Sequence, residues 1–272
     1  MKKTHYKKEL SIKATQKRNG SSNNKKDIIK IQSWLTLFSI WNPTSGTATG
    51  IYGDYGPATE RAVKNFQNEV GLTQSGIVTK VLFETLSENM KNAFEKPLIS
   101  NNLRSLVLET AQNHLENHPF ELVIKGEANS GPWVRSYMNG NDGSLWYWCM
   151  GFVQTIIDQA ASQLGKDFNA LMPTTFSCDT LGTHGLQKGL LTRYQKIRQD
   201  PSIIKPGDIF LIQKSKLDWT HTGIIISIDN NFIETIEGNT NTAGSRNGIT
   251  VMKRVRNFRK SKIDIFSIEP LV

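Results

Sequence analysis

The sequence predicts an α+β protein built from two modules. Residues 27–92 carry apolar side chains at helical spacing in three short runs, which is typical of a small three-helix bundle. Helical patterns continue to about residue 164, and from Ile204 the pattern changes to short apolar strands. Helices followed by an antiparallel sheet form an α+β layout. A length of 272 residues leaves room for two domains of ordinary size.

Residues 1–26 are expected to form a disordered basic tail. Nine lysines and arginines stand there against one acidic residue, Glu9, so the tail carries most of the net charge of +9. A segment with few large apolar residues buries too little surface to fold. Its charge fits a tether to an anionic surface (nucleic acid, anionic lipid or wall polymer) or a solubilising tail. Because Tyr6 is the only aromatic residue among these charges, no specific nucleic-acid partner is predicted.

Three helices are predicted within residues 27–95. Asp27 fits the N-cap of the first helix, which runs to about Trp41. Pro57 fits the first turn of the second helix, where its missing N–H costs nothing. Thr79 fits the cap of the third helix, which runs to about Met90. Helices this short enclose only a modest core.

This module resembles the peptidoglycan-binding domain 1 family. The resemblance is carried by the run from Ile51 to Gln67 (IYGDYGPATERAVKNFQ), followed by Gly71-Leu72 and by SGIV at 75–78. It implies a three-helix module that anchors the chain to peptidoglycan. Asp54 and Tyr55 lie at a turn that we expect to be exposed, so they are the candidates for contact with glycan or peptide. The alternative is that most of the matching residues only build the fold.

A second module is expected over residues 100–270, after a linker at Lys96-Pro97. His114 and His118 stand four apart on a predicted helix, a spacing that can place two metal ligands on one face. No further ligand of a suitable type lies nearby in the sequence. Both are therefore interpreted as surface histidines, and no metal or cofactor is predicted.

Cys149 is expected at the start of a buried helix. Apolar residues recur from Cys149 to Leu164 at helical spacing, and Gly143-Ser144 fits a turn before them. A helix start stabilises a thiolate, which is the nucleophilic form of cysteine. The alternative is a small buried apolar residue. Cys178, in a stretch interpreted as a loop (165–185), is most simply a spare thiol; a bridge between the two cysteines would consume the nucleophile.

The strands offer a base for such a nucleophile. Asn230-Asn231 predicts a hairpin turn, which brings His221, at the start of one strand, close to the end of the next. Glu237 and Asn239 are two residues apart on that second strand, so both are expected on one face. Either could orient the imidazole through its second nitrogen. The alternative is an ordinary histidine at a strand edge beside turn residues.

The order of these residues resembles the CHAP family within the papain-like NlpC/P60 hydrolases. The resemblance is carried by Cys149 at a helix start, His-x-Gly at 221–223 and Ile-Glu-Gly-Asn at 236–239. It implies a papain-like fold and cleavage of amide bonds in peptidoglycan. Cys149 would attack the carbonyl, His221 would transfer the proton, and Glu237 or Asn239 would orient His221. Members often have Gln close before the cysteine, where this chain has Trp146-Tyr147-Trp148.

Together the two resemblances imply a modular peptidoglycan hydrolase, either an N-acetylmuramoyl-L-alanine amidase or an endopeptidase, of endolysin-like organisation. Trp148 and Trp133 are interpreted as lining a substrate groove or as core residues. The alternatives are a catalytically inactive wall-binding or structural protein and, from the basic tail alone, a nucleic-acid binder. No signal peptide or membrane span is recognised, so phage-type release, specialised export or cytoplasmic storage is expected for a chain that acts on the cell wall.

Overall fold

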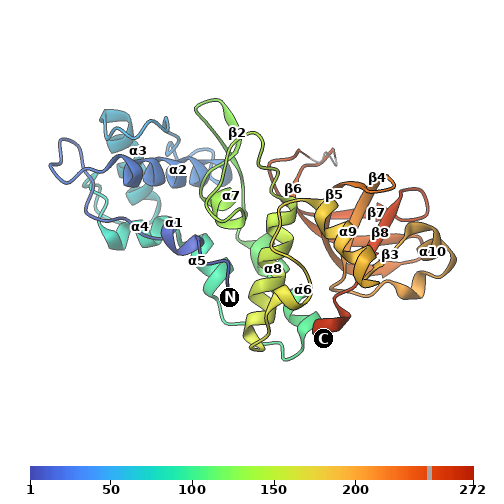
Figure 1. Ribbon diagram of the computed structural model, residues 1–272. Helices are drawn as coiled ribbons and strands as arrows, with labels where there is room; N and C mark the ends of the chain where they lie inside the picture. Colours follow the sequence, from blue (N-terminus) through green and yellow to red (C-terminus); the bar gives the residue numbers. More distant parts are fainter. Residues whose placement is uncertain (244–246) are drawn as a thin grey trace.

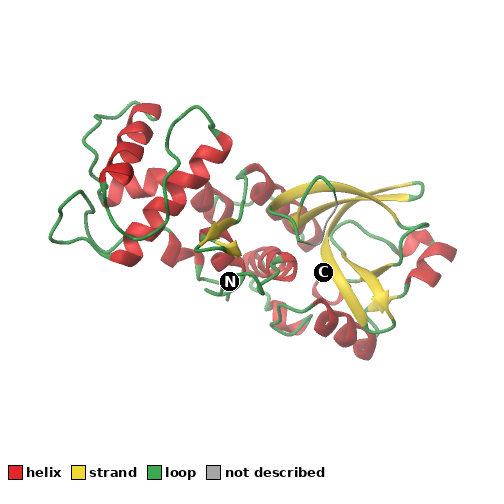
Figure 2. Ribbon diagram, turned by 90° about the horizontal axis from the view of Figure 1, so that it is seen from above, coloured by secondary structure: helices red, strands yellow, loops and turns green. Residues whose placement is uncertain are grey.

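The computed structural model describes residues 1–243 and 247–272. It places a group of helices at the N-terminal side of the molecule and a six-stranded antiparallel sheet, packed with helices, at the other (Figures 1 and 2). The α+β prediction is therefore confirmed. Within the described residues, no helix combines the length and the apolar character that crossing a bilayer demands.

The N-terminal module contains four helices after the first 24 residues. They are α2 (Lys25–Trp41), α3 (Pro57–Glu69), α4 (Lys80–Leu86) and α5 (Glu88–Glu95). The N-cap of α2 is Asn24, whose side chain accepts hydrogen bonds from the N–H groups of Lys26 and Asp27. The predicted cap at Asp27 was wrong by three residues. Pro57 and Thr79 occupy the helix starts at which they were expected.

The third predicted helix is broken at Ser87 into α4 and α5. Ser87 ends the first of these helices and begins the second, with backbone angles of φ −104° and ψ 12°. Its hydroxyl donates to the carbonyl of Phe83 at 2.9 Å, and the same carbonyl accepts the backbone N–H of Ser87 at 3.0 Å. The module therefore has four helices where three were expected.

The first residues of the chain are not a disordered tail. They form the short helix α1 (Tyr6–Glu9) and lie against both halves of the molecule (Figure 1). The backbone N–H groups of Lys2 and Lys3 donate to the carboxylate of Asp158 in α8, at 2.8 and 2.6 Å. The ring of Tyr6 stacks on that of Phe94 at 4.2 Å. Composition could not predict this order, because the partners come from distant parts of the chain.

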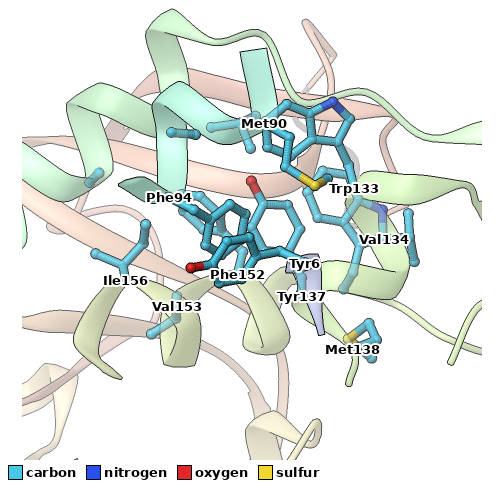
Figure 3. Packing of buried hydrophobic residues seen from close by; sticks show 14 of the residues in the cluster. Tyr6, Met90, Phe94, Trp133, Val134, Tyr137, Met138, Phe152, Val153 and Ile156 are labelled. Carbon is cyan, nitrogen blue, oxygen red and sulfur yellow. The ribbon is translucent and has the colours of Figure 1, made fainter. Parts of the chain in front are cut away.

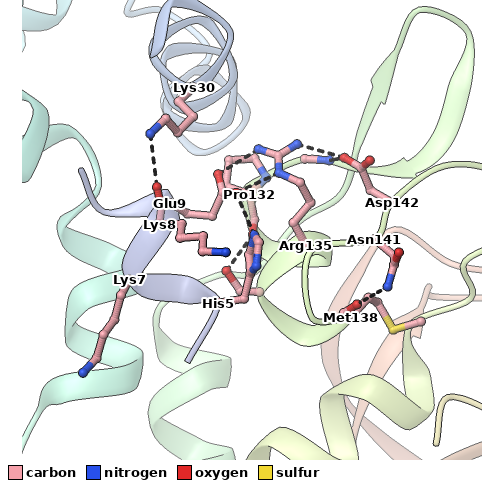
Figure 4. Close-up of polar contacts among 12 residues, drawn as sticks. His5, Lys7, Lys8, Glu9, Lys30, Pro132, Arg135, Met138, Asn141 and Asp142 are labelled. Carbon is pink, nitrogen blue, oxygen red and sulfur yellow. Dashed lines mark hydrogen bonds and ion pairs between the residues drawn. The ribbon is translucent and has the colours of Figure 1, made fainter. Parts of the chain in front are cut away.

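A buried ion pair also holds this segment. The guanidinium of Arg135, in α7 (Pro132–Tyr137), donates to both carboxylate oxygens of Glu9 at 2.8 Å and to Asp142 at 2.8 Å (Figure 4). Further along, Gln16 exchanges two backbone hydrogen bonds with Val78 in the N-terminal module. The segment predicted to be disordered thus joins the two modules.

The larger apolar core runs through both modules, and a smaller one, which includes Phe210 and Ile265, lies within the second module. The larger core lies between α5, α7 and α8 (Cys149–Gln163), with Tyr6 of the first helix inserted into it (Figure 3). Tyr137 stacks on Trp148 with ring centroids 5.6 Å apart and meets Phe152 edge-on at 5.5 Å. Because this core is shared, residues 96–97 are not a free linker between independent bodies.

The predicted surface position of His114 was wrong. It lies in α6 (Leu103–Glu116), fully buried, where Nδ1 accepts from the hydroxyl of Tyr137 at 2.8 Å and Nε2 donates to Gln159 at 3.0 Å. Burial lowers the pKa of His114 to about 4, so the ring is neutral. His118 is exposed, and its ring lies 4.6 Å from that of Trp41.

The sheet has the order β3-β8-β4-β5-β6-β7, and all its neighbours are antiparallel. A two-residue turn at Asn230-Asn231 joins β5 to β6, as predicted, and Asn230 adopts a positive φ of 49°. Helix α8 packs against β5 and β6. The strands are β3 (Leu191–Thr192), β4 (Ile209–Ser215), β5 (Asp218–Asp229), β6 (Phe232–Thr240), β7 (Thr250–Asn257) and β8 (Ile263–Phe266).

Residues 165–185, expected to be a loop, contain the start of helix α9 (Cys178–Lys188). Its glycines suggested a loop, but they serve close packing. A Cβ at Gly182 would lie 2.5 Å from the indole of Trp219, so only glycine lets the helix approach the sheet there. The remaining elements are β1 (Leu122–Ile124), β2 (Glu127–Ser130), α10 (Tyr194–Gln199) and the 3-10 helices η1 (Phe168–Ala170), η2 (Pro201–Ile203) and η3 (Glu269–Leu271).

Candidate active site around Cys149

Cys149 is the first residue of helix α8, as the sequence predicted. Its side chain is 4% exposed and lines a pocket of about 240 Å³. The first N–H groups of a helix have no partner within the helix, so partial positive charge gathers around this sulfur. The cysteine is free. Its position therefore favours a thiolate while leaving the sulfur open to a small molecule.

His221 and Glu237 meet across strands β5 and β6. His221 Nε2 donates to Glu237 Oε2 at 2.8 Å, and both side chains are almost completely buried. Gly223 makes this contact possible: a Cβ there would lie 2.8 Å from Cγ of Glu237. The glycine of the His-x-Gly motif thus leaves room for the carboxylate to reach the imidazole.

Arg256, in β7, fixes the carboxylate from the other side. Its guanidinium donates through Nε and Nη2 to the two oxygens of Glu237. The hydroxyl of Thr235 donates to the same carboxylate at 2.6 Å. Glu237 is therefore held by three residues, which fixes its orientation toward His221. Arg256 could not be predicted from the sequence, because no motif marks which residue of β7 faces Glu237.

These contacts set the charges of the site. The hydrogen bond from Cys178 and the interaction with the His221 imidazole hold the pKa of Cys149 well below its ordinary value, although burial opposes the shift. Burial alone would lower the pKa of His221, but Cys149 and Glu237 outweigh it and raise that pKa to about 9. Burial alone would raise the pKa of Glu237. The hydrogen bonds and charges of Arg256 and His221 outweigh this effect and lower that pKa to about 2.

At neutral pH these shifts describe a thiolate beside an imidazolium. Glu237 uses Nε2 of His221, so Nδ1 is the nitrogen left for the sulfur. Among the described residues, Nδ1 makes no hydrogen bond of normal geometry, although the imidazole influences the pKa of Cys149. A thiolate paired with an imidazolium is the activated form of a cysteine nucleophile.

Asn239, the alternative partner for His221, takes another position. It is buried, its backbone has a positive φ of 53°, and its amide makes no hydrogen bond within the described residues. The register between β6 and β7 shifts between Glu237 and Thr240. The strict alternation on which Asn239 was predicted to share a face with Glu237 therefore does not hold.

The pocket at Cys149 is lined by other aromatic residues than those predicted. Trp148 and Trp133 are 0% and 1% exposed, which corrects the interpretation that they line the groove at the cysteine. The indole of Trp148 donates to Glu121 at 2.8 Å. Tyr147, one residue earlier, is 45% exposed and borders the pocket. The other lining residues are Phe176, Cys178, Asp179, Asp218, Trp219 and Thr220.

The sequence signal for Tyr147 was present in the run of three aromatic residues before Cys149. A residue two positions before a helix can face solvent while its neighbour enters the core, and composition alone does not say which does. No group of three histidine, cysteine or acidic side chains suited to a metal ion is found in the part of the chain that the structure describes.

In the N-terminal module, Asp54 is exposed but Tyr55 is not. Tyr55 is 4% exposed, and its hydroxyl donates to the carbonyl of Gly76 at 2.9 Å. Tyr55 therefore holds the turn at Gly76 against the start of α3, and the prediction that it contacts ligand is wrong. Asp54 is exposed at the surface and remains a candidate.

Comparison with known proteins decides the nature of this module. Residues 24–86 match the family described as "Putative peptidoglycan binding domain". These residues form a peptidoglycan-binding domain. The match associates the chain with the bacterial cell wall and agrees with the resemblance seen in the sequence. No curated protein and no solved structure matches the chain.

The peptidoglycan-binding domain contributes aromatic residues to a second pocket, of about 410 Å³. Trp41 is 44% exposed there, and Trp34, Phe38 and Phe66 lie along the same pocket. His118 and Trp133 of the following module complete the lining. Trp133 thus borders this pocket with the edge of a buried ring, not the pocket at Cys149.

Proposed function

We propose that this protein is a peptidoglycan hydrolase that cleaves an amide bond of the wall with Cys149 as nucleophile. The observation that carries the proposal is the hydrogen-bonded array of His221, Glu237 and Arg256, together with the effect of the His221 imidazole on the pKa of Cys149. Ion pairs that only stabilise a fold are common. The pairs that Glu237 makes with His221 and Arg256 differ because His221 interacts with Cys149, which borders a pocket. A perturbed titratable group in a cleft is a candidate for function.

The reaction would begin with attack by the Cys149 thiolate on the carbonyl carbon of the amide. The imidazolium of His221 would give its proton to the departing amine, and a thioester would remain on the sulfur. Water would then attack the thioester, with neutral His221 accepting the proton, and the acid product would leave. Glu237 would keep the imidazole oriented and stabilise its charged form.

Two helix starts border the reacting sulfur. Cys149 begins α8 and Cys178 begins α9, so unpaired N–H groups from helices of 15 and 11 residues lie near the same pocket. Preorganised N–H groups stabilise the oxyanion that forms during attack. The backbone N–H of Cys149 is the first candidate for this role.

The peptidoglycan-binding domain would hold the polymer near this site. We place the contact with glycan at the pocket around Trp41, because exposed aromatic rings present a flat apolar face beside polar groups. Binding of the polymer at one module raises the concentration of cleavable bonds at the other. Amide bonds occur both at the glycan and within the peptides, so amidase and endopeptidase activities both fit this chemistry.

The decisive experiment is digestion of purified sacculi by the full chain and by Cys149→Ala. We expect the wild type to release soluble muropeptides, the variant to release none above background, and both to sediment with sacculi. Mass spectrometry of the products identifies the bond that is cleaved. Digestion by Cys149→Ala at the wild-type rate rejects the mechanism. A wild type that binds sacculi but digests none leaves a wall-binding protein without this activity.

A further inference from the structure

The geometry points to a second role for the cysteine pair: we infer that Cys149 and Cys178 form an oxidation site that a peroxide converts into an intramolecular disulfide. The proposal concerns Cys178, which the proposed hydrolysis does not require. Formation of the cross-link does not depend on hydrolase activity; only its effect on activity rests on the proposed function.

The two sulfurs are neighbours although 28 residues separate them in the chain. Cys149 Sγ and Cys178 Sγ lie 4.0 Å apart, and both thiols are free. A disulfide needs the sulfurs at about 2 Å. Each sulfur therefore has to move by roughly 1 Å toward the other, a distance that a modest side-chain rotation covers.

Both thiols also open into one pocket. Cys149 and Cys178 are among the residues that line its volume of about 240 Å³, and Tyr147 and Phe176 border the same space. Hydrogen peroxide is little larger than water, whose share of liquid volume is about 30 Å³. A small oxidant therefore fits into the pocket, whereas a thiol carried by another protein chain does not. This difference favours a disulfide within the chain.

The two thiols differ in pKa, and oxidation by peroxide followed by disulfide formation requires such a difference. The hydrogen bond from Cys178 and the His221 imidazole keep Cys149 ionised, whereas the pKa of Cys178 is raised well above its ordinary value by its contact with Cys149 and by burial. The thiolate is the form that attacks peroxide. Cys149 is therefore the sulfur that is oxidised first, and Cys178 is the thiol that resolves it.

The reaction balances as two steps. The Cys149 thiolate attacks one oxygen of hydrogen peroxide, the O–O bond breaks, and a sulfenic acid forms with release of hydroxide. Cys178 then attacks the sulfenic sulfur, losing its proton, and hydroxide leaves; the S–S bond forms. The two released hydroxides take up the two thiol protons as water. Both sulfurs are oxidised, and the peroxide is reduced.

The disulfide would stop hydrolysis reversibly, because it occupies the sulfur that attacks substrate. A thiol reductant would restore both cysteines. Without a second thiol, a sulfenic acid proceeds to sulfinic and sulfonic acids, which thiols do not reduce. Cys178 would thus protect the nucleophile from irreversible oxidation.

The test treats the folded full chain with hydrogen peroxide in slight excess and measures the intact mass. We expect the wild type to lose two hydrogens, to yield a linked peptide containing Cys149 and Cys178, and to recover both thiols in dithiothreitol. Cys178→Ser, which keeps a hydroxyl of similar size, should give oxygen-added Cys149 as its main product. Cys149→Ser should give no linked peptide. Thermal unfolding checks that each variant is folded.

Three results would overturn the proposal: oxygen added to Cys149 in the wild type with no linked peptide, a disulfide between two chains, or no change in either thiol. Activity is scored separately. If the linked peptide forms but neither the reduced nor the oxidised protein digests sacculi, the oxidation site stands and the hydrolase proposal fails. If digestion proceeds at the same rate before and after complete cross-linking, the cysteine mechanism fails.

Discussion

Arg256 and Glu237 form a two-point ion pair in the interior, with Nε and Nη2 of the guanidinium on separate carboxylate oxygens. Glu237 is 0% exposed, and its carboxylate also accepts a hydrogen bond from His221 Nε2 at 2.8 Å. Arg256 therefore keeps Glu237 ionised, and Glu237 in turn favours the charged form of His221. The charge of the imidazole depends on a residue that does not touch it.

This relationship predicts a strong coupling between the two positions. Glu237→Gln alone leaves the guanidinium of Arg256 buried without its carboxylate, and we expect a loss of about 3–5 kcal/mol in the free energy of unfolding. The double variant Glu237→Gln, Arg256→Met removes both charges and should lose much less than the sum of the two single losses. Urea unfolding of the four proteins measures this coupling. Additive losses would show that the two side chains do not interact.

The same double variant should change the titration of His221. Without the carboxylate, one of the two interactions that raise the pKa of His221 is gone, so this pKa should fall below its value of about 9. NMR titration of the His221 ring measures it. Cys178→Ala is the control, because it changes the Cys149 side of the site and keeps the carboxylate of Glu237 next to His221. An unchanged His221 pKa in the double variant would contradict the role assigned to Glu237.

Reactivity of Cys149 should persist in mildly acidic solution. An ordinary thiol has a pKa of about 8.5, so its thiolate fraction falls about tenfold for each pH unit below that. The depressed pKa of Cys149 predicts that alkylation by iodoacetamide continues with little loss from pH 8 to pH 6. His221→Ala should shift the profile to higher pH. A wild-type profile that follows an ordinary thiol would show that no thiolate is stabilised.

The N-terminal segment should contribute to stability through Glu9. This carboxylate is 4% exposed and receives two hydrogen bonds from Arg135, so Glu9→Gln should lower the free energy of unfolding by about 1.5–3 kcal/mol through the loss of charge-assisted hydrogen bonds, while Asp142 keeps its own contact with Arg135. Arg18→Gln, at the exposed pair with Glu60, is the matched control and should leave the Tm nearly unchanged. Equal effects of the two substitutions would contradict the structural role of Glu9.

Acid should weaken the same contact. Burial opposes the shift, but Arg135 and His5 outweigh it and lower the pKa of Glu9 from 4.5 to about 2. The unfolded chain therefore takes up the proton first as pH falls. The stabilisation from Glu9 is fully present above about pH 4.5 and is lost as pH approaches 2. Unfolding free energies of wild type and Glu9→Gln, measured between pH 6 and pH 2.5, should therefore converge.

The peptidoglycan-binding domain offers a contrast between an exposed and a buried aromatic residue. Trp41→Ala should weaken sedimentation with sacculi and change the Tm little, because the ring is half-exposed at the pocket. Tyr55→Phe should leave sedimentation unchanged but cost about 1–3 kcal/mol, because the buried carbonyl of Gly76 loses its donor. Asp54→Ala tests the remaining exposed candidate. Loss of binding in Tyr55→Phe without loss of stability would reverse these assignments.

Local patterns predicted the parts of the fold that depend on neighbours in sequence. The helix starts at Pro57, Thr79 and Cys149 follow from single residues and apolar spacing. The hairpin at Asn230-Asn231 brought His221 to Glu237 by local pairing, so this half of the site could be predicted. The choice between Glu237 and Asn239 could not, because a register shift late in β6 is not visible in the sequence.

The features that were missed depend on contacts across long stretches of chain. Lys2 and Lys3 are ordered by Asp158, and Glu9 by Arg135, more than 120 residues away. Cys178 approaches Cys149 because α9 packs closely on the sheet through a glycine that resembled a loop residue. Tertiary packing thus overrode composition in the tail and local propensity in α9.

The first 16 residues bond at one end to α8, whose first residue is Cys149, and at the other to Val78 in the peptidoglycan-binding domain. The two modules are therefore joined by the non-covalent contacts of this segment and by a shared interior, in addition to the chain that connects them at residues 96–97. Under the proposed function, a rigid joint would fix the separation between a glycan held at the pocket around Trp41 and the sulfur of Cys149. Cleavage would then fall at a constant offset from the point of attachment, and products of a narrow range of lengths would result.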